Sequence, residues 1–310
     1  MKIRGKLFLM LLLPVLGMFG FSAYLLWEKW HVVDEMKTLG VMSGLSVTAS
    51  GLTHELQRER GMSAGYVGSH GEKFGKELDT QRPVTDRKVA DLRAYLETHP
   101  GIAAHAVYDE DLGKALVEIG RLAAVRKSVS VFGVTGTDAM NYYTGIIEAL
   151  LHVVEHVSSE SPDPAVGRIA LAHASFLQAK EHVGQERALL SGAFAAGRFA
   201  PGAYEKFLGV VAEQDTFTHV FLQSALAGQV EFFQRKTQDK SVEEVASLRA
   251  IAMQKAGSGN FGVDPNRWFS ASTSKIQLFK EVEDRLVDDM SAEVTRLASA
   301  ARMTFGVVVA

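Results

Sequence analysis

The chain has 310 residues, of which 47% are hydrophobic, so it can bury one or two sizeable cores. Its formal net charge is −3, which argues against nucleic acid as a partner. The sequence contains no cysteine, which excludes disulfides and cysteine-ligated metal sites. Ala, Leu, Glu, Lys and Arg dominate between a few prolines, and this composition predicts an all-α protein.

The first strong feature is an uncharged apolar run from Leu7 to Trp27. A run of about 20 such residues is long enough to cross a bilayer as a helix. Lys2, Arg4 and Lys6 precede the run, and the positive-inside rule then places residues 1–6 in the cytoplasm. A cleaved signal peptide is the alternative, but no Ala-x-Ala site follows. The sequence therefore predicts a transmembrane helix over residues 7–27.

Between Trp27 and the C-terminus the pattern is helical throughout. The connections are short and glycine-rich, which is typical of helices that pack as antiparallel bundles, and the length favours two bundles sharing long helices. The expected helices span residues 33–68, 71–99 with an interruption at Pro83, 103–132, 138–157, 164–199, 203–226, 229–255 with a break near Asp239, and 263 to the C-terminus. Asp264, followed by Pro265, is expected to cap the last of these helices.

The last eight positions, residues 303–310, are apolar and follow Arg302. We interpret them as the start of a second transmembrane helix, because they are too short to span a bilayer alone. A tail packed on the core is the alternative. Two spans would then bracket a sensor region of residues 28–302 outside the membrane.

Arg60 stands out because it shares a helical face with Ala64 and Val67, beside Ser63. Small side chains let helices approach closely and leave little water around a charge. The same pattern returns 127 residues later around Arg187. The two segments read Leu56-Gln57-Arg58-Glu59-Arg60-Gly61-Met62-Ser63-Ala64-Gly65-Tyr66-Val67 and Gly184-Gln185-Glu186-Arg187-Ala188-Leu189-Leu190-Ser191-Gly192-Ala193-Phe194. They are either two ordinary Arg–Glu surface pairs, or two guanidinium groups that converge on one anion.

The first segment resembles the opening motif of the nitrate- and nitrite-sensing (NIT) domain. Three further segments resemble that family in the same order, so the likeness covers residues 45–295. These are the Tyr-Tyr-Thr helix Met140-Asn141-Tyr142-Tyr143-Thr144-Gly145-Ile146-Ile147, the central motif Ala179-Lys180-Glu181 with Gln185 to Ser191, and the last helix from Asp264 to Met290 with Trp268, Thr273, Glu281, Glu283 and Leu286. Each motif is weak alone, but four in order are specific.

The resemblance implies a fold and a cellular setting. Members of the family have two stacked four-helix bundles, flanked by transmembrane helices in bacterial receptors. We therefore expect a homodimeric sensor in the bacterial inner membrane with residues 28–302 in the periplasm. Its expected output is chemotaxis, with a histidine kinase or a cyclic-nucleotide enzyme as alternatives, and its partners would be downstream signalling proteins.

The resemblance also implies a small-anion site for nitrate or nitrite. The opening motif assigns ligand binding to Arg60, and the central motif extends it to Arg187. Arg249 is a third candidate, because the residues around it in the sequence are otherwise small and apolar. Ser63 and Ser191 are candidate hydroxyl donors. A guanidinium is planar and offers paired donors, which suits a planar anion. The alternative is that these arginines are structural.

Other classes of function are weaker. His152, Glu155 and His156 fit a His-x-x-Glu-His zinc-peptidase pattern, and two histidines four apart on a helix can share a metal. A solvated helix end explains the same residues. A structural helical protein without a ligand is a third alternative. We expect neither an enzyme nor a bound metal or cofactor.

Overall fold

The all-α prediction is confirmed. The computed structural model describes residues 3–102, 106–161 and 163–309, and within them the chain forms ten α-helices and no strand. Side-chain positions are described for residues 12, 14–102, 110–156, 161 and 163–306. The helices are α1 (Ile3–Gly68), α2 (Gly75–Thr98), α3 (Ala106–Gly120), α4 (Leu122–Ser130), α5 (Gly136–Glu160), α6 (Pro164–Ala196), α7 (Ala203–Ser224), α8 (Ala227–Thr237), α9 (Lys240–Gln254) and α10 (Pro265–Val309).

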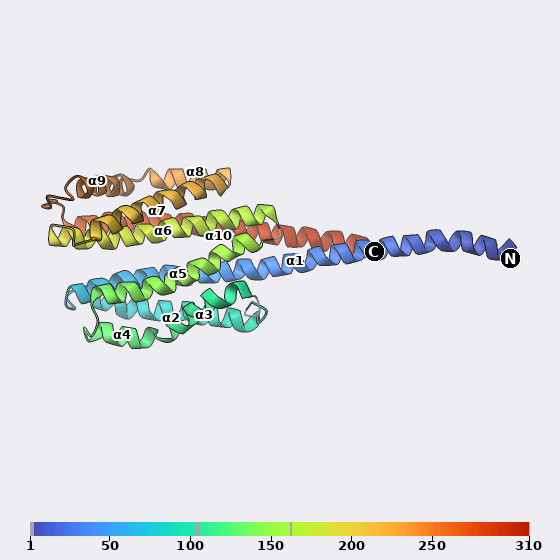
Figure 1. Ribbon diagram of the computed structural model, residues 1–310, viewed down its shortest axis with the longest axis horizontal. Helices are drawn as coiled ribbons and strands as arrows, with labels where there is room; N and C mark the ends of the chain where they lie inside the picture. The colour runs from blue at the N-terminus through green and yellow to red at the C-terminus, as the bar shows by residue number, and fades with distance from the viewer. Residues whose placement is uncertain (1–2, 103–105, 162, 310) are drawn as a thin grey trace.

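The helices form two groups that lie one above the other in Figure 1. In the first group, α2 and α5 pack along α1 and α3 packs against α5, with α4 at one end. The helix α1 contributes apolar residues at helical spacing, such as Leu45, Leu52 and Leu56, which are fully buried. They pack in one core with residues of α5, including Ile146 and Leu150. The first group is thus built around the middle of α1.

The second group consists of α6 to α10 and has an aromatic core. Trp268 of α10 packs edge-on against Phe194 of α6, with ring centroids 5.6 Å apart. Farther along α6, Phe176 packs against Phe221 and Phe279. The two groups meet where α1 packs against α10 and α5 packs against α6. The segments around Arg60 and Arg187 therefore come from helices at the junction of the two groups.

Most predicted helices are observed, and the differences have local causes. The predicted interruption at Pro83 is wrong, because α2 continues through it. Pro83 is exposed, so water can reach the carbonyl that its missing N–H leaves without a partner. The predicted helix over residues 103–132 is divided, since α3 ends at Gly120 and α4 begins at Leu122. Glycine weakens a helix interior, which fits a division at this point.

The predicted break near Asp239 and the predicted helix start at Asp264 are both observed. Asp239 ends the connection between α8 and α9, and its carboxylate accepts a hydrogen bond from the Ser241 N–H at 2.8 Å. Asp264 accepts one from the Asn266 N–H at 3.0 Å, directly before α10 begins at Pro265. Both carboxylates satisfy N–H groups that the first turn of a helix leaves unpaired.

The predicted membrane spans are not supported by the structure. In the part of the chain that it describes, no helix is long and apolar enough to cross a membrane. Within the first predicted span, the side chains of residues 7–11 and 13 lie outside those described. The side chains of 307–310 in the second predicted span also lie outside the description.

Candidate functional site

Arg60 of α1 and Arg187 of α6 line the same two cavities. The first cavity has a volume of about 420 Å³ and is also lined by His54, Lys180 and Thr273. The second cavity, of about 630 Å³, is lined by these two arginines as well and extends toward the start of α10. The two segments related by the 127-residue offset thus place their arginines at one location, as predicted from the sequence.

The Arg60 guanidinium is almost fully buried and has a carboxylate partner. Its Nη1 and Nη2 donate to Oε1 and Oε2 of Glu181 at 2.5 and 3.0 Å, and Nη1 also donates to Thr144 Oγ1 at 2.9 Å. Glu181 accepts further hydrogen bonds from the amides of Gln57 and Gln185. Burial would raise the pKa of Glu181, but the Arg60 charge and these hydrogen bonds hold it below the usual value. The pair is therefore ionised and charge-neutral.

The Arg187 guanidinium has a different set of partners. Its Nη1 donates to Thr273 Oγ1 of α10 at 3.1 Å, and its guanidinium carbon lies 5.0 Å from the centre of the Phe269 ring. Among the described residues, no carboxylate lies within ion-pair distance of it. Burial lowers the pKa of Arg187 to about 10, and the neighbouring Arg60 charge lowers it as well. At neutral pH this side chain still carries a positive charge that an anion could compensate.

Two glycines make room for these arginines. A Cβ at Gly61 of α1 would lie 2.9 Å from Nη2 of Arg187, and a Cβ at Gly184 of α6 would lie 3.2 Å from Nη2 of Arg60. Each helix therefore carries a glycine where the arginine of the other helix lies against it. This reciprocal arrangement explains why both segments need glycine beside their arginine.

Replacing Gly61 with alanine should displace Arg187 and weaken anion binding by about tenfold, the cost of one distorted hydrogen bond. The same change should leave the fold intact, because alanine favours a helix interior by about 1 kcal/mol over glycine. Gly145→Ala in α5 is the matched control, since a Cβ there meets open space. Titration calorimetry with nitrate measures the effect. Equal affinities for the two variants would contradict the role assigned to Gly61.

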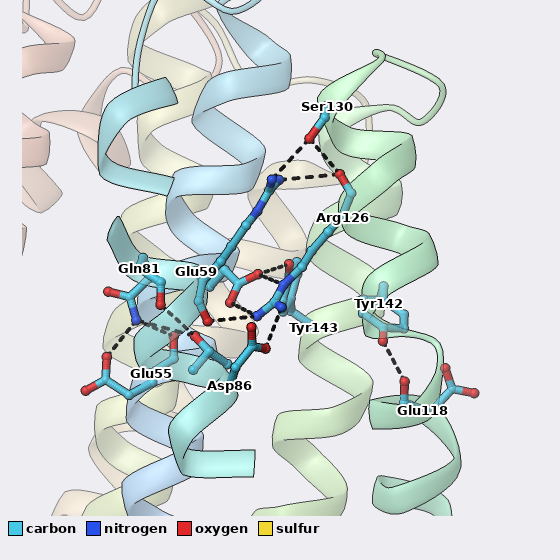
Figure 2. Close-up of polar contacts among 11 residues, drawn as sticks. Glu55, Glu59, Gln81, Asp86, Glu118, Arg126, Ser130, Tyr142 and Tyr143 are labelled. Atoms are coloured by element: carbon cyan, nitrogen blue, oxygen red, sulfur yellow. Dashed lines mark hydrogen bonds and ion pairs between the residues drawn. The ribbon is translucent and has the colours of Figure 1, made fainter. Parts of the chain in front are cut away.

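The glutamates that precede the two arginines in sequence have other partners. Arg126 of α4 donates from Nε and Nη2 to the two carboxylate oxygens of Glu59 at 2.7 and 2.8 Å. Figure 2 shows that the hydroxyl of Tyr143 reaches the same carboxylate and that Arg126 also contacts Asp86. Although burial would raise the pKa of Glu59, the hydrogen bonds and charge of Arg126 lower it. Glu59 thus points away from the cavities, as expected from its position one residue from Arg60.

The second group repeats this arrangement with Arg249. Its Nε and Nη2 donate to the two oxygens of Glu186 at 2.6 and 2.5 Å, and Nη2 also donates to Gln214 at 2.9 Å. Burial lowers the pKa of Arg249, but the hydrogen bonds and charge of Glu186 raise it above the ordinary value. Arg249 does not belong to the lining of either cavity. The structure therefore places it away from the two arginines with which the sequence grouped it.

The two candidate serines also differ in position. Ser191 lines the second cavity, but its hydroxyl donates to the backbone carbonyl of Arg187 at 2.7 Å. Ser63 is fully buried beside the hydroxyl of Tyr143 and is not part of either cavity lining. Neither hydroxyl is directed at the space between the arginines, where the sequence suggested a hydrogen-bond donor to the anion.

Sequence reasoning missed three residues that contact the arginines. Thr144 and Thr273 each accept a hydrogen bond from one of them, and Glu181 forms the ion pair with Arg60. All three lie inside the segments that resemble the NIT family. Their contacts cross between helices, so a reading of single helix faces could not assign them.

The His-x-x-Glu-His segment does not form a metal site. Among the described residues, no three His, Asp or Glu side chains converge in a way that could hold a metal ion. His152 and His156 both face Asp111 of α3, at 3.6 and 3.3 Å. Glu155 instead accepts a hydrogen bond from Gln178 of α6 at 2.6 Å. The segment connects α5 with two neighbouring helices.

A sequence profile described as "Nitrate and nitrite sensing" matches residues 51–291 of the chain. The chain belongs to this NIT family. The arginines, their threonine partners and Glu181 all lie within the matched region. The resemblance inferred from the four motifs is confirmed.

The chain is also similar to a nitrate regulatory protein and to a solved antiterminator structure. A nitrate regulatory protein from Klebsiella oxytoca is 28% identical over 257 residues, which cover 83% of this chain and 64% of that protein. The solved structure of the NasR transcription antiterminator superimposes with a TM-score of 0.78 and 25% identity, covering 96% of this chain and 84% of that one. The chain therefore spans less than two thirds of the Klebsiella relative. The matched family and these relatives point to a sensor or regulator rather than an enzyme.

These findings correct several predictions. The prediction of a transmembrane receptor for chemotaxis, in the inner membrane with a periplasmic sensor, is wrong, because these relatives are a regulatory protein and an antiterminator. The exclusion of nucleic acid, which rested on net charge alone, is also wrong, since a protein of this fold is a transcription antiterminator. Net charge over a whole chain does not report on one surface or on a further segment.

Proposed function

We propose that this chain is the nitrate- and nitrite-binding region of a regulatory protein, and that the anion binds between Arg60 and Arg187. The observation that carries the proposal is the Arg187 guanidinium, which faces two cavities beside Arg60 without a carboxylate partner among the described residues. Arg187 is half-buried between neighbouring helices, and a charge that is withdrawn from water in this way is unfavourable unless it is paired. A small anion would supply the missing partner.

The chemistry of the cavity suits a planar monoanion. Arginine presents paired N–H groups in one plane, and Thr273 beside Arg187 is a further hydroxyl that can rotate toward an oxygen. The apolar edge of the site, formed by Phe269 and Phe74, limits hydration and strengthens each hydrogen bond. The match to the nitrate- and nitrite-sensing family and the printed name of the Klebsiella relative support nitrate as the ligand.

We further infer how binding is transmitted. The two groups of helices act as two stacked antiparallel four-helix bundles, with α1 and α10 packed together near the C-terminal end. Arg60 lies on α1, whereas Arg187 is tied to α10 because its backbone carbonyl accepts a hydrogen bond from the Trp268 indole at 2.9 Å. An anion that contacts both arginines would shift α1 relative to α10. A ligand shifts such an equilibrium only if it binds the two arrangements unequally.

Titration calorimetry of the chain with sodium nitrate tests the proposal directly. Saturable binding is expected for nitrate and for nitrite, with none for sodium chloride at the same ionic strength. Distances between spin labels on α1 and α10, near residues 36 and 294, should change on adding nitrate. A folded chain that shows no saturable heat with nitrate or nitrite would overturn the proposed ligand.

A further inference from the structure

The charges that line the first cavity are unequally compensated. Four cationic side chains belong to its lining: Arg58, Arg60, Lys180 and Arg187. Three of them have carboxylate partners, which are Glu55, Glu181 and Glu283. Within the described residues Arg187 has none, so the cavity carries a net charge close to that of one guanidinium.

The two halves of the site differ at several related positions, and one of these concerns the carboxylate partner of Arg60. Arg60 and Arg187 are related by the 127-residue offset, and each donates to a threonine, Thr144 or Thr273. The same offset relates Glu181, the partner of Arg60, to His54. His54 lines the first cavity, and burial together with the Lys180 charge lowers its pKa to about 2. One half of the site therefore holds a carboxylate where the other holds a neutral imidazole.

We propose that Glu181 is a specificity-determining residue that sets the charge of the site, so that the site accepts a monoanion and rejects a dianion. The inference rests on the proposed anion site and adds a selectivity to it. With Glu181 ionised against Arg60, a bound nitrate or nitrite balances the remaining charge of Arg187. A dianion such as sulfate would leave one negative charge without a partner in a cavity that is only partly open to water, which is disfavoured.

The surroundings of Glu181 show that its charge can be removed with little change of shape. Its two oxygens accept from Gln57 Nε2 and Gln185 Nε2 at 2.8 and 2.9 Å. Both partners are amides, and an amide can rotate to present its oxygen instead of its nitrogen. Glu181→Gln can therefore keep a hydrogen-bonded network around Arg60 while the site gains one positive charge.

Perchlorate and sulfate make a matched pair of probes, because both are tetrahedral oxyanions of similar size and they differ in charge. Competition calorimetry against nitrate gives the affinity of each for the native chain and for Glu181→Gln. We expect the ratio of sulfate affinity to perchlorate affinity to rise by about tenfold or more in the variant, since one added charge a few ångströms away acts twice as strongly on a dianion. Differences in hydration between the probes are the same for both proteins and cancel in this comparison.

His54→Glu provides the reverse test. A carboxylate at this position would add a negative charge to the cavity that Arg187 also lines, and nitrate affinity should fall by about tenfold or more. His54→Gln, which adds no charge, is the matched variant, and the loss of nitrate affinity in His54→Glu is measured relative to it. Circular dichroism shows whether each variant is folded. If Glu181→Gln does not fold, His54→Glu tests the inference.

The outcomes separate this inference from the proposed function. If the native chain binds neither nitrate nor nitrite, the proposed ligand is wrong. If it binds nitrate but Glu181→Gln leaves the sulfate-to-perchlorate ratio unchanged, or His54→Glu retains full affinity, only the role of Glu181 is overturned. A raised ratio together with loss of binding in His54→Glu supports the inference.

Discussion

Replacing Arg187 with methionine is expected to abolish nitrate binding, with a loss of affinity of at least about 100-fold. The variant removes the cation that lacks a carboxylate partner among the described residues, together with its hydrogen bond to Thr273. Methionine can still pack against Phe269, so the helix contact is kept. In the absence of nitrate, the free energy of unfolding should stay the same or rise, because an uncompensated charge has been removed.

Arg60→Met should behave differently from Arg187→Met, although Arg60 lines the same cavities as Arg187. It too should lose nitrate, but it leaves the Glu181 carboxylate buried without its ion-pair partner. Breaking one side of a buried pair costs about 3–5 kcal/mol. Urea unfolding without ligand therefore distinguishes the two variants, and Arg58→Met, at an exposed position of α1, is the control for both. Equal destabilisation by the changes at Arg60 and Arg187 would contradict the unequal compensation seen in the structure.

The sequence predicted the helices well because periodicity and capping are local properties. The starts at Asp239 and Asp264 were predictable from residues within one turn of each other. The division between α3 and α4 was not, since glycines elsewhere in the chain lie inside helices without ending them. The expected break at Pro83 failed because its exposure, which lets water satisfy the freed carbonyl, is decided by packing against other helices.

The candidate site was predictable only in part. The internal repeat placed Arg60 and Arg187 together, because two similar helices at equivalent positions bring similar residues to one junction. It could not show that Glu181 forms its ion pair with Arg60, since that contact joins α1 with α6 and has no counterpart in the repeat. Arg249 was misleading for a related reason. An arginine among small residues can satisfy its charge with a glutamate on another helix, and the sequence does not show which one.

Replacing Arg249 with methionine should reduce stability and leave the affinity of the folded chain for nitrate nearly unchanged. Glu186 is about as buried as a side chain can be, with 1% exposure, and it would lose both of its bonds to Arg249. The remaining bond from Gln214 at 3.1 Å and the nearby Lys275 ammonium, which donates to Gln214, compensate this carboxylate only in part. We expect a cost of about 3–5 kcal/mol in the free energy of unfolding.

The double variant Arg249→Met and Glu186→Met separates the cost of the orphaned carboxylate from the value of the pair. Apolar replacement of both partners of a buried ion pair is often neutral, so the double variant should recover most of the stability. Arg126→Met is the matched change in the first group, because Arg126 holds Glu59 in the same way. Urea unfolding and nitrate titration of all three variants make the measurement.

If Arg249→Met weakened nitrate binding tenfold without loss of stability, Arg249 would belong to the anion site despite its distance from both cavities. If it only unfolds more easily, the two Glu–Arg pairs hold α4 and α9 in place, and the arginines next to these glutamates remain free to bind the anion.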